Sequence, residues 1–104
     1  MIRVRFHTAD DRIVGFTLDG HAGAGKHGED IVCAAVSSAA YMTANTVTEI
    51  IGATADIAVD DGYMSVTLTD KIDGCQEILS GFQLHLQALQ EQYPNRVHLM
   101  NTEV

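Results

Sequence analysis

Cys33 and the histidines that precede it are the residues of this chain best suited to covalent chemistry. A cysteine thiolate attacks carbonyl carbons, and a neighbouring histidine can first remove the thiol proton, so such a pair suits nucleophilic catalysis. Both His21 and His27 come shortly before Cys33, and either could be this base. Spacing in the sequence alone does not choose between the two histidines.

The residues around Cys33 predict that it lies near the beginning of a helix. Asp30 can cap a helix that begins at Ile31, because its carboxylate accepts hydrogen bonds from the free N–H groups of the first turn. Near a helix N-terminus the peptide dipoles favour a thiolate over a thiol. The Asp30 carboxylate opposes this effect, since a second negative charge close by is unfavourable. A protonated histidine partner would offset that repulsion.

Other interpretations, in which Cys33 is not a nucleophile, compete with this one. Most cysteines are small, buried hydrophobic residues, and a single Cys with a single His is a weak signal by itself. A metal site built from His21, His27 and Cys33 would match no compact zinc pattern, so we expect neither a metal nor another cofactor. Cys75 belongs to the apolar stripe of a later helix, and we expect it in the core.

The N-terminal part of the chain predicts a hairpin followed by a loop. Apolar and polar residues alternate at 2–6, which is typical of a half-buried strand, and after the turn at 8–12 a second strand follows at 13–18, so that the two form a hairpin. The segment 20–30 then forms a loop in which glycines recur, namely Gly20, Gly23, Gly25 and Gly28. Because glycine adopts backbone conformations that other residues avoid, we expect this loop to be flexible and to close over a bound peptide.

The central part predicts a long helix and a second hairpin. Apolar residues recur at helical spacing from Ile31 to Ile51, and Gly52 is a natural end for this helix. Asp61-Gly62 lies between two apolar runs, 56–60 and 63–68, which is a strong signal for a tight turn between strands.

The C-terminal part predicts a second helix and a last strand. Asp73 is expected to cap this helix, with Gln76 as its capping-box partner. Its apolar stripe consists of Cys75, Ile78, Leu79, Phe82, Leu86 and Leu89. Pro94 ends the helix, and residues 96–100 form the strand. The order β-β-α-β-β-α-β predicts an α+β fold in a single domain, 1–104, with a mostly antiparallel sheet and two helices on one face.

Composition narrows the possible partners and location of the protein. The chain has 104 residues and a net charge of −8, and its six Lys and Arg residues are scattered, which argues against direct nucleic-acid binding. The excess of acidic residues would instead favour binding to a basic polypeptide partner. No apolar run has the ~18 residues of a membrane span, and the N-terminus lacks the apolar core of a signal peptide. We therefore expect no membrane partner and a cytoplasmic location with reduced thiols.

Two segments of the sequence carry a distinctive pattern, GHAG at 20–23 and GEDIVCAAVS at 28–37. This pattern resembles the Prp family of bacterial ribosomal-processing cysteine proteases, and the resemblance extends over the whole chain in length and element order. It implies an endopeptidase that removes a short N-terminal extension from a large-subunit ribosomal protein precursor. In that family the extension belongs to the protein whose N-terminus reaches toward the peptidyl-transferase centre.

The resemblance also implies roles for particular residues. By motif, Cys33 is the nucleophile and His21 the base of a Cys–His dyad. Asp30, Ser37 and Gly20 are supporting residues of the site, and Gly23, Gly25 and Gly28 lie in the flexible loop. His27 falls in the variable part of that loop, so no role is carried over to it.

The same resemblance implies a homodimer, and the sequence adds an argument for one. The helix expected at 31–51 has apolar or small residues on more than one face, including Ala34, Ala40, Met42, Ala44 and Val47. A second copy of the chain would cover the face that the sheet does not. The alternative function is a non-catalytic homodimeric module that binds a peptide or a ribosomal partner in the same groove.

Overall fold

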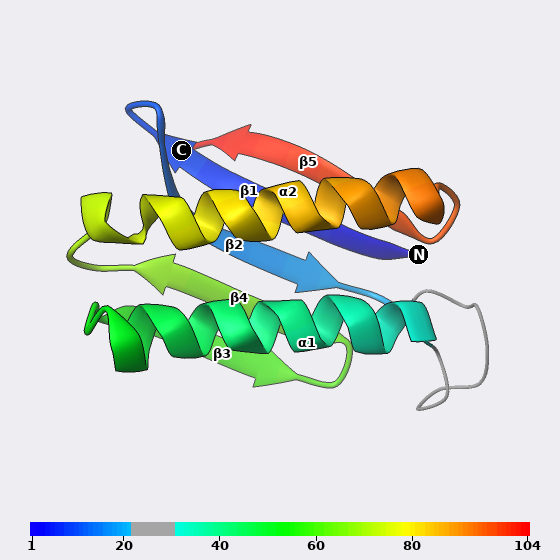
Figure 1. Ribbon diagram of the computed structural model, residues 1–104, viewed down its shortest axis with the longest axis horizontal. Helices are drawn as coiled ribbons and strands as arrows, with labels where there is room; N and C mark the ends of the chain where they lie inside the picture. The colour runs from blue at the N-terminus through cyan, green and yellow to red at the C-terminus, as the bar shows by residue number, and fades with distance from the viewer. Residues whose placement is uncertain (22–30) are drawn as a thin grey trace.

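The computed structural model describes residues 1–21 and 31–104. In them the chain forms a five-stranded sheet with two helices on one face (Figure 1). The strands are β1 (Ile2–Ala9), β2 (Arg12–Asp19), β3 (Ala55–Asp60), β4 (Tyr63–Leu68) and β5 (Val97–Glu103). The helices are α1 (Ile31–Asn45), continued by the π-helical turn η1 (Thr46–Ile50), and α2 (Gln76–Gln92), preceded by the 3-10 turn η2 (Asp73–Cys75). The expected α+β fold is confirmed.

The strands of the sheet lie in the order β3-β4-β2-β1-β5. β1 and β2 form the expected hairpin, β3 and β4 the second one, and only the pairing of β1 with β5 is parallel. The two hairpins meet where β2 pairs antiparallel with β4, with Asp19 opposite Tyr63. This pairing places the end of β2 beside the turn between β3 and β4, which matters for the site.

One face of the sheet packs against both helices, with α2 over β1 and β2 and α1 over β3 and β4 (Figure 1). The period-two pattern of β1 puts Ile2, Val4 and Phe6 into this core, where each is at most 1% exposed. Phe16 of β2 meets Phe82 of α2 edge to face, with ring centroids 4.8 Å apart. The expected apolar stripe of the second helix is therefore the surface that covers the sheet.

The first helix runs without interruption from Ile31 to Ile50, close to the expected range, but its last turn widens to a π-helix. The length and mean hydropathy of Ile31–Ile50, 1.2, would also suit a membrane span. However, Val36, Ala40 and Val47 are buried against the sheet, which equally fits a core helix of a folded domain.

The expected capping box at Asp73 and Gln76 is wrong. The Asp73 carboxylate accepts a hydrogen bond from Arg12 at 3.0 Å. The Gln76 amide accepts from the Ile13 N–H at 2.8 Å and donates to the Ile13 carbonyl at 2.9 Å. Since β4 pairs with β2 only as far as Gly15, Ile13 lies beyond the end of β4 and needs other partners. Gln76 satisfies them and thereby attaches the start of α2 to the sheet.

Candidate active site

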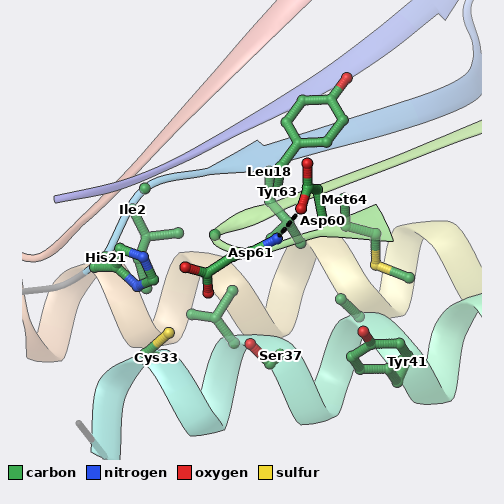
Figure 2. Close-up of a pocket in the computed structure, with 14 residues that line it drawn as sticks. Ile2, Leu18, His21, Cys33, Ser37, Tyr41, Asp60, Asp61, Tyr63 and Met64 are labelled. Atoms are coloured by element: carbon green, nitrogen blue, oxygen red, sulfur yellow. Dashed lines mark hydrogen bonds between the residues drawn. The ribbon is translucent and has the colours of Figure 1, made fainter. Parts of the chain in front are cut away.

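A pocket of about 230 Å³ lies at the N-terminal end of α1 (Figure 2). Its walls come from the first turns of α1, the end of β2 and the turn between β3 and β4. Cys33, His21, Ser37 and Gly20 all line it. The pocket therefore brings together every site residue that the sequence singled out within the described ranges.

Cys33 is the third residue of α1 and is half-buried. The first N–H groups of a helix have no carbonyl acceptor within the helix, so they create a positive potential around this position. Figure 2 shows the thiol directed toward the end of the pocket that also holds His21 and Asp61. A thiolate at this position would face the pocket, where a peptide carbonyl could reach it.

His21 follows Gly20, which is the first residue after the end of β2. The Gly20 N–H donates to the Gly62 carbonyl at 2.8 Å, and the Met1 ammonium donates to the His21 carbonyl. Gly20 has φ +98°, and a Cβ atom there would overlap the Met1 carbonyl oxygen. These contacts fix the backbone that carries the His21 ring and explain why glycine precedes it.

The third wall of the pocket comes from the turn between β3 and β4. The Asp61 N–H donates to the Asp60 carboxylate at 2.7 Å, which stabilises the turn. In Figure 2 the Asp61 carboxylate is directed toward the His21 ring. A carboxylate in this place can help to orient the imidazole ring.

From Cys33 the pocket continues along α1. Ser37 and Tyr41 follow Cys33 at intervals of four residues, so the three side chains share one face of the helix. Tyr41 and Met64 of β4 line the other end of the pocket (Figure 2). The result is an elongated hollow, polar near Cys33 and more apolar near Met64.

Sequence reasoning missed the contribution of the second hairpin and of Tyr41. Asp61-Gly62 was interpreted only as a tight turn, and nothing in the periodicity indicated that β4 would pair with β2 rather than stay beside β3 alone. Asp30, His27 and the loop glycines Gly23, Gly25 and Gly28 lie outside the described residues, so their expected roles stay predictions.

The two thiols of the chain lie in different surroundings. Cys75, the last residue of η2, is fully buried, as expected for a core residue. Burial, followed by the nearby Asp70 carboxylate, raises the pKa of the Cys75 thiol. Cys33 is instead half-buried at a pocket. Within residues 1–21 and 31–104, no three His, Cys, Asp or Glu side chains are grouped closely enough to hold a metal ion.

Known proteins share both the sequence pattern and the fold. The family model of cysteine protease Prp matches residues 1–98. The ribosomal processing cysteine protease Prp of Staphylococcus aureus is 31% identical over 103 residues, 95% of this chain and 97% of that protein. The crystal structure of S. aureus Prp with a covalently linked product peptide matches at a TM-score of 0.91 and 30% identity, covering 98% and 100% of the two chains. The structure of S. aureus Prp with a substrate peptide matches at a TM-score of 0.86 and 29% identity, with the same coverage.

Proposed function

The chain belongs to the cysteine protease Prp family, and from this we propose that it processes a ribosomal protein precursor. In this proposal it removes a short N-terminal extension from a large-subunit ribosomal protein, in the cytoplasm, with Cys33 as nucleophile and His21 as base. The name of the S. aureus relative, ribosomal processing cysteine protease Prp, supports the processing activity. The N-terminal extension and the roles of Cys33 and His21 follow from the resemblance to the family pattern.

The observation that carries the proposal is the meeting of Cys33 and His21 at one pocket. The two residues come from different segments, α1 and the residues directly after β2, and both line the same pocket of about 230 Å³. The S. aureus relative has been crystallised with a covalently linked product peptide, which is the kind of adduct that a nucleophilic cysteine forms.

The proposed reaction begins with transfer of the Cys33 thiol proton to the His21 imidazole. The Cys33 sulfur then forms a bond with the carbonyl carbon of the scissile peptide, and the resulting tetrahedral oxyanion is stabilised by backbone N–H groups. Backbone N–H groups at the start of α1 or in the glycine-rich loop before it are the candidates for this role. The C–N bond breaks, and the His21 imidazolium protonates the leaving amine.

The second half of the reaction restores the enzyme. The N-terminal fragment remains attached to Cys33 as a thioester. Water, deprotonated by His21, attacks the thioester carbonyl, and the Cys33 sulfur leaves as a thiolate or takes back the proton. No atom other than those of the peptide, the two side chains and one water is required.

The deciding experiment is incubation of the protein with the precursor of the large-subunit ribosomal protein, followed by intact-mass measurement. Wild type should shorten the precursor at its N-terminal extension, and Cys33→Ala should leave the mass unchanged while keeping the wild-type melting temperature. If Cys33→Ala binds the precursor and wild type does not cleave it, the non-catalytic binding module is the better description. If Cys33→Ala cleaves as wild type does, Cys33 is not the nucleophile.

A further inference from the structure

The turn between β3 and β4 is in direct contact with the His21 ring, although the two segments are far apart in the chain. A Cβ atom built on Gly62 would lie 2.8 Å from Nε2, 3.2 Å from Cε1 and 3.5 Å from Cδ2 of His21. Non-bonded carbon atoms prefer about 3.5–4.0 Å. The imidazole therefore occupies the space that a side chain at position 62 would need.

The backbone of Gly62 also contacts the segment that carries His21. The Gly62 carbonyl accepts the Gly20 N–H at 2.8 Å, directly before His21, and Tyr63 pairs with Asp19 in the sheet. Gly62 is thus fixed relative to β2 by the sheet, and it lies against the His21 ring. Its φ of +67° is a further reason for glycine, but that conformation alone would also permit asparagine.

We propose that Gly62 is a positioning residue, whose missing side chain lets the His21 imidazole lie where it can take the Cys33 proton. This inference rests on the proposed function, in which His21 is the base. Gly62 does not itself contact the reacting atoms, and it affects the reaction only through the position of the His21 ring. A methyl group at this position can be accommodated if the ring moves aside, but the movement takes the base away from the thiol.

The test compares Gly62→Ala with Gly52→Ala. Gly52 has nearly the same backbone conformation, φ +77°, but a Cβ atom there would meet only Lys71 Nζ, at an ordinary 3.6 Å. Both variants therefore carry similar backbone strain, and only the first displaces His21. We expect kcat/KM for precursor cleavage to fall about 100-fold in Gly62→Ala, as for other small misplacements of catalytic groups. Gly52→Ala should stay within about twofold of wild type.

A second measurement needs no substrate, so it separates this inference from the proposed function. The rate of Cys33 alkylation by iodoacetamide is followed from pH 5 to pH 10. Gly62→Ala should react more slowly than wild type at neutral pH and equally fast above the ordinary thiol pKa of about 8.5, where no base is needed. A general loss of structure would not make the two rate profiles differ at neutral pH and converge at high pH.

Gly62→Asn covers the case in which Gly62→Ala does not fold. Asparagine tolerates a positive φ but still adds a Cβ atom, so it should give the same displaced base in a stable protein. The inference is overturned if the folded variants at position 62 keep both the alkylation profile and the kcat/KM of Gly52→Ala. A wild type that does not cleave the precursor would overturn the proposed function instead, and the alkylation profiles would still decide the role of Gly62.

Discussion

Cys33 and Cys75 offer an internal comparison of two thiols in one chain. Cys75 is 0% exposed and its pKa is raised by burial, whereas Cys33 is half-buried at a pocket, in the first turn of α1. We predict that iodoacetamide labels Cys33 first in the native protein at neutral pH, by at least about tenfold, because the thiolate is the reactive form. Peptide mapping after brief labelling measures the ratio. Preferential labelling of Cys75 would contradict the assignment of Cys33 as the nucleophile.

The two histidines before Cys33 can be distinguished by substitution. His21→Ala should lower precursor cleavage by about 10²–10⁴-fold, the usual contribution of a general base. His27→Ala should keep most of the activity, because the family pattern assigns it no role, while the backbone of His21 is held by Gly20 and Gly62. Initial rates with the same precursor check both variants. The opposite ranking would mean that His27 is the base.

Substitution of Asp61 tests a further single residue of the site, the carboxylate beside His21. Figure 2 shows its carboxylate directed toward the His21 ring, so its loss should leave the ring less well oriented. We predict that Asp61→Asn lowers kcat for precursor cleavage by about tenfold, since a base that is less well oriented transfers the proton less efficiently. Asp56→Asn removes the same charge from an exposed position on β3 and serves as the control. Equal rates in the two variants would show that the charge of Asp61 is irrelevant to the site.

Among the elements, the start of α2 is joined to β2 by the hydrogen bonds of the Gln76 side chain. The Gln76 amide makes two hydrogen bonds to Ile13 and a third to the Ile72 carbonyl. Gln76→Ala would leave the Ile13 N–H and carbonyl without these partners, so we predict a loss of about 1–3 kcal/mol in the free energy of unfolding. Urea denaturation measures it, with Gln87→Ala on the exposed face of α2 as control. Equal stability of the two variants would show that water replaces the amide at no cost.

Local patterns predicted most of the elements, and the reasons for the exceptions are non-local. Alternation in β1, helical spacing in α1 and the Asp61-Gly62 turn each depend on near neighbours, so one sequence suffices to find them. The role of Gln76 depends on where β4 stops along β2, a fact set by long-range pairing. The same is true of the site, because only the pairing of β2 with β4 brings Gly62 to His21. Cys33 and His21 were predictable mainly through the family pattern.

At the scale of the whole molecule, alkaline stability should depend on the buried thiol. Because burial raises the pKa of Cys75, the folded protein keeps the thiol proton to higher pH than the unfolded chain does. The contribution of Cys75 to the free energy of unfolding is therefore complete below the ordinary thiol pKa of about 8.5 and is lost as the pH rises through the raised folded-state value. Denaturation of Cys75→Ala from pH 7 to pH 10.5 should show a smaller alkaline decline than that of wild type or Cys33→Ala. Identical slopes would contradict this linkage.

The outer surface of α1 bears on the expected homodimer. Of the residues expected to widen the apolar surface of this helix, Ala40, Ala44 and Val47 lie in the core, while Ala34 and Met42 are exposed. Tyr41 adds to this surface, at 48% exposed beside Met42 at 58%. The apolar surface left for a partner is thus smaller than the sequence suggested, but it includes large side chains on a helix that also carries Cys33.

We predict a homodimer in which the exposed face of α1 around Met42 is buried, because a two-fold contact would remove these side chains from water in both copies. Size exclusion coupled to light scattering should give about twice the chain mass of 11.2 kDa at micromolar concentration. Met42→Glu should shift the mass to that of one chain, since it places a charge in an apolar contact. Leu84→Glu is the matched control, because Leu84 is also a large exposed apolar residue, at 68%, but lies on α2. A wild-type mass near 11.2 kDa would defeat the dimer, and dissociation by Leu84→Glu but not by Met42→Glu would move the interface from α1 to α2.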